Sequence, residues 1–276
     1  MPIVDTFYDD STSQLSESFL EKGFVITPCE NREGLDAIRD SIVGNACSRL
    51  GLSTPDDKED FLNNIQNHLS LETLNEFRLA LYFALNNEAW LRPTYFSLVR
   101  STLEELVGNE LAMQNRVNLS INMPNDNSSL VTLHSDSFGG DSPFQVVVWI
   151  PLVGVEGNKS VYVLPPEKNR EVVPRLSEYG DNGGMAAIFE EIKDEVIYAE
   201  LKYGEALIFT PNILHGADVN TSEHTRWSMN VRFKGLFTPY TSYEKQIGNY
   251  YLPITARVVS QVGMDHIHPE KFEGHD

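Results

Sequence analysis

The sequence has only two cysteines, Cys29 and Cys47, in 276 residues. Two cysteines are too few for a disulfide framework or for a cysteine-rich zinc site. The chain also begins without a basic segment followed by an apolar one, and no apolar run reaches the length that spans a bilayer. We therefore expect a reduced, cytoplasmic protein that has no membrane partner.

Basic residues are scarce as well. The sequence holds 21 lysines and arginines against 40 aspartates and glutamates, a formal net charge of −19. Phosphate backbones and anionic lipid surfaces repel such a chain, so we expect no nucleic-acid partner. The acidic residues are scattered rather than gathered in blocks, which is typical of a solvated surface.

No linker rich in proline, serine or glycine divides the chain, and no internal repeat is visible. Its 41% hydrophobic content suffices for a sizeable core. We therefore expect a single domain over residues 1–276. Within it, residues 1–110 would be mainly helical support, 116–236 a β core, and 237–276 a C-terminal tail or lid.

The first 110 residues show apolar positions at helical spacing, apart from one short apolar strand. Arg92 and Pro93 are expected to end one of the helices, because the residue before a proline avoids helical geometry. The expected strand is 23–28, and the expected helices are 11–22, 33–50, one opening at 55, one from 70 to about 92, and 95–107.

After Gly108 the pattern changes to short alternating or apolar runs separated by glycine, proline and asparagine. Such runs indicate an antiparallel sandwich or jelly-roll barrel, and helices followed by strands give an α+β fold with helices outside the β core. The expected strands are 116–124, 129–136, 145–152, 160–165, 195–201, 206–210 and 227–233.

Residues 165–194 interrupt the strands and are too long for a hairpin turn, so they could carry function. Basic residues gather there and just before, which favours either an anionic substrate or chance clustering: Lys159, Lys168, Arg170 and Arg175. Near the chain end, His266, His268 and His275 are expected to be exposed rather than ligands.

His134 and Asp136 lie one residue apart in an expected strand, so their side chains would point to the same side. An imidazole beside a carboxylate supplies two ligands of a two-histidine, one-carboxylate iron site. The pair alone also fits a strand-end aspartate beside a structural histidine.

A second group of residues favours the metal site. His215 follows a strand and a turn and begins the next strand, and Arg226 comes eleven residues later. Arg226 and Ser228 share one face of a strand, where a guanidinium and a hydroxyl can hold a carboxylate.

Together these residues resemble the Fe(II)/2-oxoglutarate-dependent oxygenases, and among them the phytanoyl-CoA dioxygenase-like group. The resemblance covers about residues 116–236 and includes the strand that runs from Gln145 to Pro151-Leu152. It implies a double-stranded β-helix with iron on His134, Asp136 and His215. The chain departs from the group at 156–160 and 166–170, which weakens any transfer of acyl-CoA specificity.

The resemblance further implies that Fe(II), 2-oxoglutarate and O2 are required, and that no catalytic residue is needed beyond the metal centre. Arg226 and Ser228 would bind the far carboxylate of 2-oxoglutarate, with Arg232 as the fallback. A carboxylate at Asp136, where related halogenases have a small residue, implies oxygenation. Alternate strand residues would line the pocket: Asn122, Thr132, Gln145, Trp149 and Arg232.

The substrate is expected to be a small molecule, and a homodimer is one option for the assembly. The Ser-Pro-Phe-Gln-Val run at 142–146 is similar to oxygenases of bacterial surface-carbohydrate clusters, which suggests a carbohydrate substrate, and the basic residues at 159–175 would suit an anionic one. Hydroxylation is the expected reaction, and epimerisation, desaturation and ring closure remain open. Alternatives are an acyl thioester or lipid, or an amino-acid-derived metabolite. From other classes, a hydrolase or lyase on the same metal ligands and a non-catalytic carbohydrate-binding jelly roll also remain open.

Overall fold

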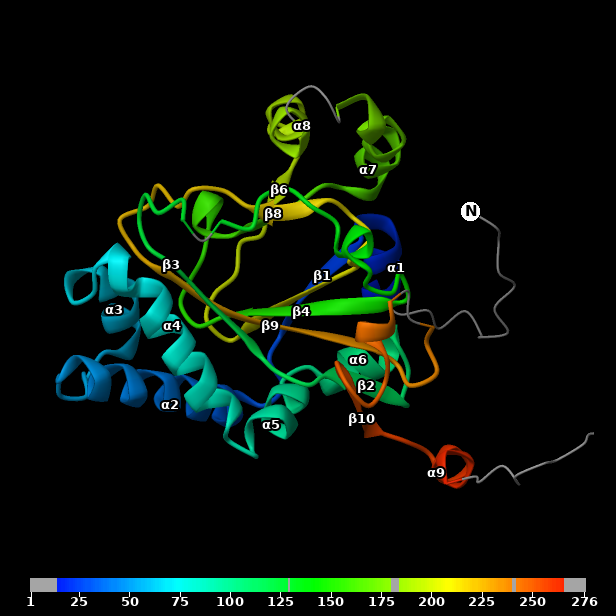
Figure 1. The fold of residues 1–276 in the computed structure, drawn as a ribbon, viewed down its shortest axis with the longest axis horizontal. Coiled ribbons are helices and arrows are strands. Elements are labelled where there is room, and N and C mark those ends of the chain that lie inside the picture. The colour runs from blue at the N-terminus through cyan, green and yellow to red at the C-terminus, as the bar shows by residue number, and fades with distance from the viewer. Residues whose placement is uncertain (1–13, 129, 180–183, 240–241, 266–276) are drawn as a thin grey trace, which may run out of the picture.

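The helices of the N-terminal part cover one side of a β sandwich in the computed structural model, which describes residues 14–128, 130–179, 184–239 and 242–265 (Figure 1). The long helix α2 (Arg32–Leu50) begins where the Asn31 side chain accepts from the amide of Gly34. It ends at Gly51, whose φ of 68° is the left-handed conformation that glycine adopts without strain. Its apolar positions are buried because they recur on one face.

Five other helices belong to this part of the chain, and a proline lies inside one of them. The expectation that Arg92 and Pro93 end a helix is wrong, because α4 already ends at Asn86 and Pro93 lies in the first turn of α5, where its missing N–H has no helical partner. The helices are α1 (Gln14–Lys22), α3 (Lys58–Asn63), α4 (Leu71–Asn86), α5 (Leu91–Ser97) and α6 (Arg100–Leu106).

A large antiparallel sheet forms the side of the sandwich next to these helices. Its order is β1-β7-β4-β9-β2-β10. The strand β3 pairs with the first half of β9, and β2 pairs with its last residues. The strands are β1 (Phe24–Pro28), β2 (Leu111–Gln114), β3 (Asn118–Asn122), β4 (Gln145–Pro151), β7 (Glu205–Phe209), β9 (Arg226–Gly235) and β10 (Tyr251–Thr255).

A smaller sheet faces it, in the order β6-β5-β8, from β5 (Val161–Val163), β6 (Ile197–Tyr198) and β8 (His215–Ala217). An isolated bridge between His134 and His215 extends its edge. Two facing antiparallel sheets with these long connections form the jelly roll, so the fold class expected from the sequence is confirmed.

The central strands bury both faces. Odd-numbered residues of β9 point toward the helices, where the Trp227 Nε1 donates to the Leu62 carbonyl at 2.8 Å. The Tyr95 hydroxyl of α5 donates to the Val148 carbonyl at 3.0 Å. Even-numbered residues of β9 point between the sheets and include Arg226, Ser228 and Arg232, so the alternation of β9 presents its polar side to the interior.

Two strand expectations need correction. Residues 129–136 form no strand in their described part; His134 makes only the bridge, and Asp136 opens a 3-10 helix (Asp136–Gly139). The local alternation is real, but no neighbouring strand runs beside it for its whole length. Conversely, β2 and β10 were not expected from the sequence, because they are short and β10 contains Pro253.

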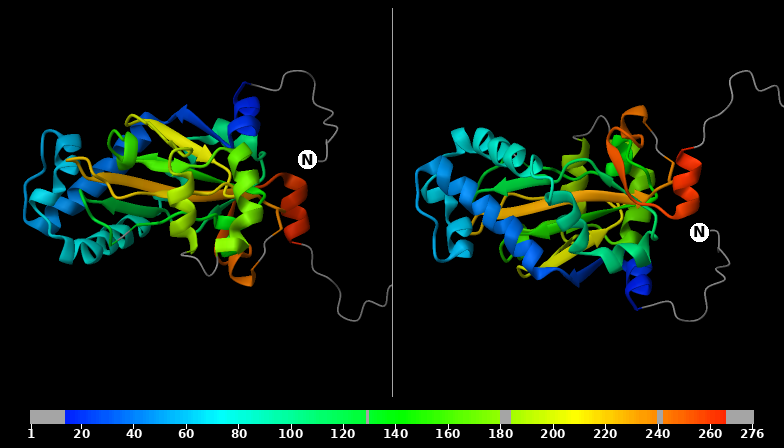
Figure 2. Two further views of the ribbon diagram at one scale, coloured as in Figure 1. Left: turned by 90° about the horizontal axis from the view of Figure 1, so that it is seen from above. Right: turned by 90° about the horizontal axis from the view of Figure 1, so that it is seen from below.

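The 165–194 segment folds into α7 (Pro166–Val172), a 3-10 helix (Val173–Tyr179) and α8 (Gly184–Ile192). These helices stand on the outer face of the small sheet (Figure 1), and Figure 2 shows α2 to α4 at one end of the molecule and α9 (Val258–Met264) at the other. Residues 180–183, His266, His268 and His275 lie outside the described residues.

The basic residues of this segment do not gather at one site. Lys168 pairs with Glu171 and Glu195, and Arg175 with Glu191. Lys159 is buried elsewhere, donating to Asn63 and to the Gly154 carbonyl. Arg170 is exposed, and none of the four residues lines the cavity described below, so they do not form a common anion site there.

No helix within the described ranges is both long and apolar enough to cross a membrane.

Candidate active site

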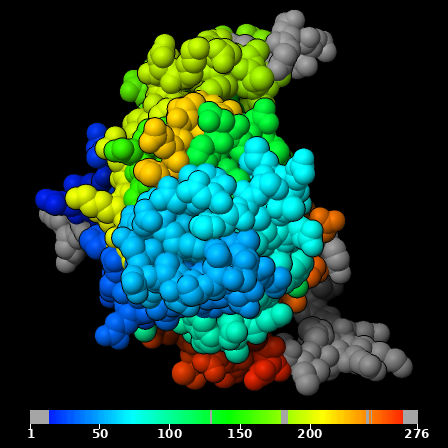
Figure 3. All heavy atoms as spheres, turned by 90° about the vertical axis from the view of Figure 1, so that its left-hand side faces the viewer, coloured from blue at the N-terminus to red at the C-terminus, as the bar shows by residue number. Residues whose placement is uncertain are grey.

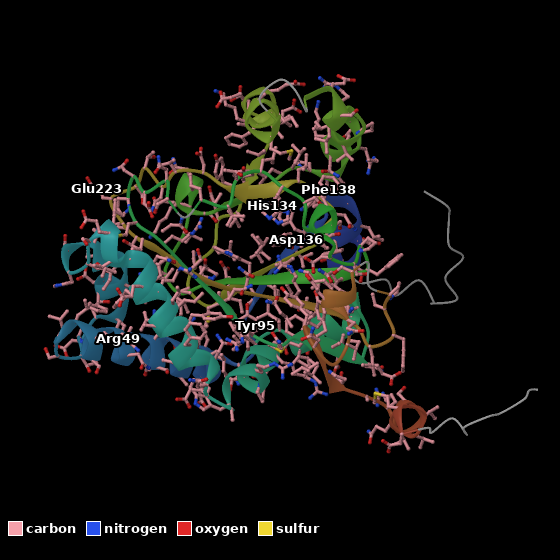
Figure 4. The ribbon with its side chains drawn as sticks, in the orientation of Figure 1. Arg49, Tyr95, His134, Asp136, Phe138 and Glu223 are labelled. Carbon is pink, nitrogen blue, oxygen red and sulfur yellow. The ribbon has the colours of Figure 1, made fainter. Side chains whose placement is uncertain are left out.

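A cavity of about 890 Å³ lies between the two sheets and extends to α4. Its walls come from β3, β4, β5, β8 and β9, so segments far apart in the sequence meet there. His134, Asp136 and His215 lie together in this cavity, and Figure 4 shows His134 and Asp136 in the space between the sheets.

The backbone fixes the relative position of the two histidines. The His134 amide donates to the His215 carbonyl at 2.9 Å, and the His215 amide donates back at 2.8 Å. Ser135 is extended, so the chain carries Asp136 back to the same side, and the Ser135 hydroxyl donates to the Pro211 carbonyl. The side chains thus converge through the bridge and the following turn, without the regular strand.

The ligand atoms of the three residues all lie within 4.8 Å of one another. Nε2 of His134 is 3.4 Å from Oδ1 of Asp136, and Nε2 of His215 is 3.9 Å from the same oxygen. Each histidine places Nδ1 near a backbone carbonyl, Thr132 at 2.8 Å and Ile213 at 2.9 Å. Those carbonyls favour protonation of Nδ1, which leaves both Nε2 lone pairs directed at the centre.

The three side chains shift one another's pKa values in different directions. Burial alone would raise the pKa of Asp136, but the contact with His134 and the charge of Arg232 hold it well below its usual range. Burial, followed by the neighbouring His134, lowers the pKa of His215 to about 4. For His134, burial is outweighed by Asp136 and the Thr132 carbonyl, which raise its pKa above the ordinary value.

Arg232 holds the other oxygen of the carboxylate. Its Nε donates to Oδ2 of Asp136 at 2.9 Å, and its Nη2 lies 2.7 Å from the same atom. Burial would lower the pKa of Arg232, but Asp136 and Asp141 raise it above the ordinary value. Arg232 is therefore occupied by the carboxylate, which argues against its being the fallback anchor for a cosubstrate.

A layer of polar residues supports this pair from behind. Asp141 is 3.8 Å from Arg232 and accepts from Lys245 at 2.9 Å and from the Tyr251 hydroxyl at 3.1 Å. The same hydroxyl lies 2.8 Å from Oε1 of Gln145. Lys245 and Tyr251 belong to the C-terminal segment, so that segment packs around the site.

Arg226 is buried deep in the same interior. Its Nη1 donates to the Ser160 carbonyl at 3.1 Å, and its Nη2 donates to Oδ1 of Asn122. Burial lowers the pKa of Arg226 to about 10, so the guanidinium stays charged at neutral pH although no carboxylate pairs with it within the described ranges.

Three buried polar atoms here have no partner among the described residues: Nε of Arg226, Oγ of Ser228 on the same strand, and Oγ of Ser160, whose carbonyl accepts from Arg226. Arg226 lines the cavity, whereas the two serines are fully buried behind its wall. A buried unsatisfied group is costly, and it marks a place where a ligand is expected. A carboxylate accepts from a guanidinium and from hydroxyls, so these atoms fit one end of a dicarboxylate.

The donor set also fits a divalent iron. Two imidazoles and one carboxylate on one face are typical of non-heme Fe(II) oxygenases, and the cavity side stays open for further ligands. Among the residues expected to line the pocket, Trp149 and Arg232 do so, and Asn122 contacts Arg226. Thr132 is exposed and Gln145 is buried beside Tyr251, and neither lines the cavity.

Sequence reasoning missed Ser160, Asp141 and Arg78, a cavity-lining residue of α4. Ser160 and Asp141 reach the site only through contacts distant in the chain, and no local pattern marks them. The sequence around Arg78 gives a weak indication of a special role, because Arg78 is the one basic residue of α4.

Solved structures with a similar fold include non-heme oxygenases. One is a ThoJ–Ni complex, a non-heme monooxygenase, which is 14% identical and has a TM-score of 0.54. The match covers 88% of this chain and 84% of that one. EvdMO1 matches at 15% identity and TM-score 0.52 over 81% and 50% of the two chains. The α-ketoglutarate-dependent carbocyclase SnoK from nogalamycin biosynthesis matches at 14% and 0.50 over 87% and 94%.

At these identities the likeness shows a shared fold, and no curated protein matches the sequence. The family assignment comes from sequence. The family model for phytanoyl-CoA dioxygenase (PhyH) matches residues 52–228, which is more than half of the chain. The matched segment includes His134, Asp136, His215, Arg226 and Ser228. The chain therefore belongs to the phytanoyl-CoA dioxygenase family of Fe(II)- and 2-oxoglutarate-dependent oxygenases.

Proposed function

We propose that His134, Asp136 and His215 hold the Fe(II) of this oxygenase. The observation that carries the proposal is their convergence on one point of the cavity, with Nε2 of both histidines facing Oδ1 of Asp136. Because Arg232 binds Oδ2, the carboxylate presents a single oxygen to the metal. His215 supplies a neutral imidazole at physiological pH, since its pKa is about 4.

We also propose that Arg226 and Ser228 bind the far carboxylate of 2-oxoglutarate, with Ser160 beside them. Their unpartnered buried atoms support this role. Asn122 and the Ser160 carbonyl orient the guanidinium from the opposite side, so it is positioned before any ligand arrives. When bound, Fe(II) and 2-oxoglutarate supply the O2-dependent oxidation, which converts the cosubstrate into succinate and CO2.

The reaction proposed for the substrate is hydroxylation of a small, anionic molecule that bears hydroxyl groups, such as a carbohydrate of a surface-polysaccharide pathway. The cavity of about 890 Å³ suits a molecule of that size beside the cosubstrate. Asp136 keeps a carboxylate at the metal, which favours oxygenation over halogenation. Membership of an oxygenase family sets aside the hydrolase, lyase and non-catalytic alternatives.

The chain is proposed to work as one unit over residues 1–276. The helices before β2 support the large sheet, and the jelly roll carries the site. The C-terminal segment covers the site from behind through Lys245 and Tyr251. Held this way, the part of the tail around Lys245 and Tyr251 is proposed to be a fixed part of the site rather than a free lid.

The test is the visible absorption band that forms when Fe(II) and 2-oxoglutarate bind together without oxygen. The native chain and Asp40→Ala, a variant of an exposed aspartate, are expected to show the band. Asp136→Ala is expected to lose it. Absence of the band in the native chain, or an unchanged band in Asp136→Ala, would overturn the metal assignment. Succinate formation under oxygen then separates catalysis from simple binding.

A further inference from the structure

Helix α4 turns a polar face toward the cavity. Asn75, Arg78 and Tyr82 follow each other at intervals of three and four residues, and all three line the cavity. The adjacent face, with Leu74, Phe77, Leu81 and Leu85, is buried in the core. Figure 3 shows the side of the molecule that α2 to α4 form (blue to cyan). The helix thus brings a cation to the cavity wall from outside the jelly roll.

The charges of the cavity wall are unbalanced. Among the described residues, its lining includes three arginines, Arg78, Arg226 and Arg232, but a single acidic residue, Asp136. This is unexpected in a chain of net charge −19. Arg232 is paired with Asp136, and Arg226 has its proposed partner in the far carboxylate of 2-oxoglutarate. Arg78 remains as a cation that neither cofactor explains.

Arg78 has no carboxylate partner within the described ranges. Its Nη1 donates to the Leu119 carbonyl of β3 at 3.3 Å, and its Nη2 donates to Oδ1 of Asn75 at 2.8 Å. These neutral contacts fix the guanidinium in place but leave its charge uncompensated and three N–H groups for a ligand. Arginine in such a setting is suited to bidentate binding of phosphate or carboxylate.

A pair of amides lies in the same cavity. Asn118 and Asn230 face each other across β3 and β9, and Nδ2 of Asn118 donates to Oδ1 of Asn230 at 2.9 Å. Both line the cavity. The bond leaves Oδ1 of Asn118 as an acceptor and Nδ2 of Asn230 as a donor. One acceptor beside one donor matches the hydroxyl groups of a polyol.

We propose that Arg78 binds an anionic group of the primary substrate, a phosphate or a carboxylate, while Asn118 and Asn230 bind its hydroxyls. This rests on the proposed function, because it uses the cavity beside the metal ligands. The substrate is therefore an acidic hydroxylated small molecule that enters with its charge toward α4. The basic residues at 159–175 take no part, since none of them lines the cavity.

The experiment uses the full chain loaded with Ni(II) and 2-oxoglutarate, so that Arg226 is occupied. Inorganic phosphate, acetate, glucose and glucose 6-phosphate are titrated calorimetrically. The native chain is expected to bind phosphate or acetate, and whichever binds more tightly identifies the anion. Glucose 6-phosphate should bind more tightly than inorganic phosphate because the amides add contacts. Glucose alone should bind most weakly.

Arg78→Gln is expected to weaken anion binding about 10- to 100-fold, as loss of charged hydrogen bonds does. Arg78→Lys should recover part of it. Arg116→Gln is the matched control, because Arg116 is exposed near Tyr82 and Phe83 but does not line the cavity. It should bind anions as the native chain does. Thermal unfolding of each variant shows whether the fold is kept.

Three results would overturn the inference: no anion binding by the native chain, equal binding in Arg78→Gln, or equal affinity for glucose and glucose 6-phosphate. If phosphate bound directly to the metal, Arg78→Gln and the native chain would bind it equally. The anaerobic band with Fe(II) and 2-oxoglutarate is measured on the same samples. A band without anion binding refutes the role of Arg78 alone, whereas a missing band refutes the proposed function itself.

Discussion

Arg232 directs two nitrogens, at 2.9 and 2.7 Å, to one oxygen of Asp136 and leaves the other oxygen facing the two histidines. One guanidinium therefore decides which oxygen of the carboxylate is offered to a metal. The two residues lie 96 positions apart, and the pairing of β4 with β9 places Arg232 opposite Val147, on the wall of the cavity.

Replacing Arg232 by methionine is expected to free Oδ2 and allow both oxygens to bind the metal. The absorption spectrum of the Co(II)-loaded variant should change in the region that reports coordination number. The metal-free variant should lose about 3 kcal/mol of unfolding free energy, because a buried carboxylate is left without its partner. Urea unfolding measures that loss.

Arg100→Gln is the control for this change, since Arg100 forms an exposed pair with Glu104. Its stability should stay close to that of the native chain. If Arg232→Met keeps the native Co(II) spectrum, Arg232 does not set the binding mode of Asp136.

Replacing Arg226 by alanine is expected to raise the 2-oxoglutarate requirement about 100-fold, because a charge-assisted pair of hydrogen bonds is lost. Affinity for Ni(II) should change far less, since Arg226 does not contact the three metal ligands. Ser228→Ala should have the same effect in weaker form, as its unpartnered hydroxyl lies on the same face of β9.

Titrations of Ni(II) and of 2-oxoglutarate separate the two affinities. Arg226→Lys keeps the positive charge but loses the paired N–H groups of the guanidinium. Its 2-oxoglutarate requirement should therefore lie between those of Arg226→Ala and the native chain. An unaffected 2-oxoglutarate requirement in Arg226→Ala would remove Arg226 from its proposed role.

Metal binding should strengthen as the pH rises from about 6 to 8, because imidazole ligands bind in their neutral form. The raised pKa of His134 makes it the group that protonates first. His215 stays neutral throughout this window, since its pKa is about 4. Calorimetry in buffers of different ionisation enthalpy should detect the proton that His134 releases.

The contribution of His134 to the stability of the metal-free protein should run in the opposite direction, and also opposite to that of His215, whose lowered pKa makes stability rise as the pH increases from about 4 toward the ordinary histidine pKa. A histidine whose pKa is raised by folding stabilises the fold fully below its ordinary pKa, and that contribution is lost as the pH rises through the raised value. His134→Gln should remove this dependence, which urea unfolding at several pH values would show. Equal pH dependence in His134→Gln and the native chain would contradict the assignment.

Gly216, the neighbour of His215, leaves no room for a side chain. A Cβ built there would lie 2.6 Å from the Tyr162 hydroxyl and 3.0 Å from the Thr132 carbonyl carbon. Gly216→Ala is therefore expected to shift the small sheet and weaken Ni(II) binding at least several-fold, because His215 moves with it. Gly44→Ala is the control: it lies within α2 with nothing within 4 Å, and should stabilise the protein by about 0.5–1 kcal/mol. Native Ni(II) affinity in Gly216→Ala would show that the site tolerates the shift.

The elements that the sequence predicted are those whose pattern is local. Leu35, Ile38 and Ile42 recur at helical spacing and form the buried face of α2. The apolar run of β4 and the alternation of β9 likewise specify buried strands. Because β9 alternates, the placing of Arg226 and Ser228 on one interior face followed from the sequence alone.

What could not be predicted depends on contacts between distant segments. The turn at Asp136 replaces a strand because only His134 finds a pairing partner there. Arg232 has the position of an interior residue in the alternation of β9, but no neighbouring sequence feature predicts its contact with Asp136. Arg78 reaches the cavity from a helix, and Ser160 contacts Arg226 from a loop, and the sequence patterns of both segments indicate only packing.

The pairing of β1 with β7 has a consequence for biosynthesis. Phe24 of β1 pairs with Phe209 of β7. The strand β1 is therefore synthesised early but has no partner strand until β7 has left the ribosome. Arg232, Lys245 and Tyr251 emerge later still, although they surround Asp136. The nascent chain therefore holds His134 and Asp136 long before the residues that support them have been made. Iron loading is thus an event of the finished polypeptide, and the waiting strand edge is the part of the chain most in need of protection during synthesis.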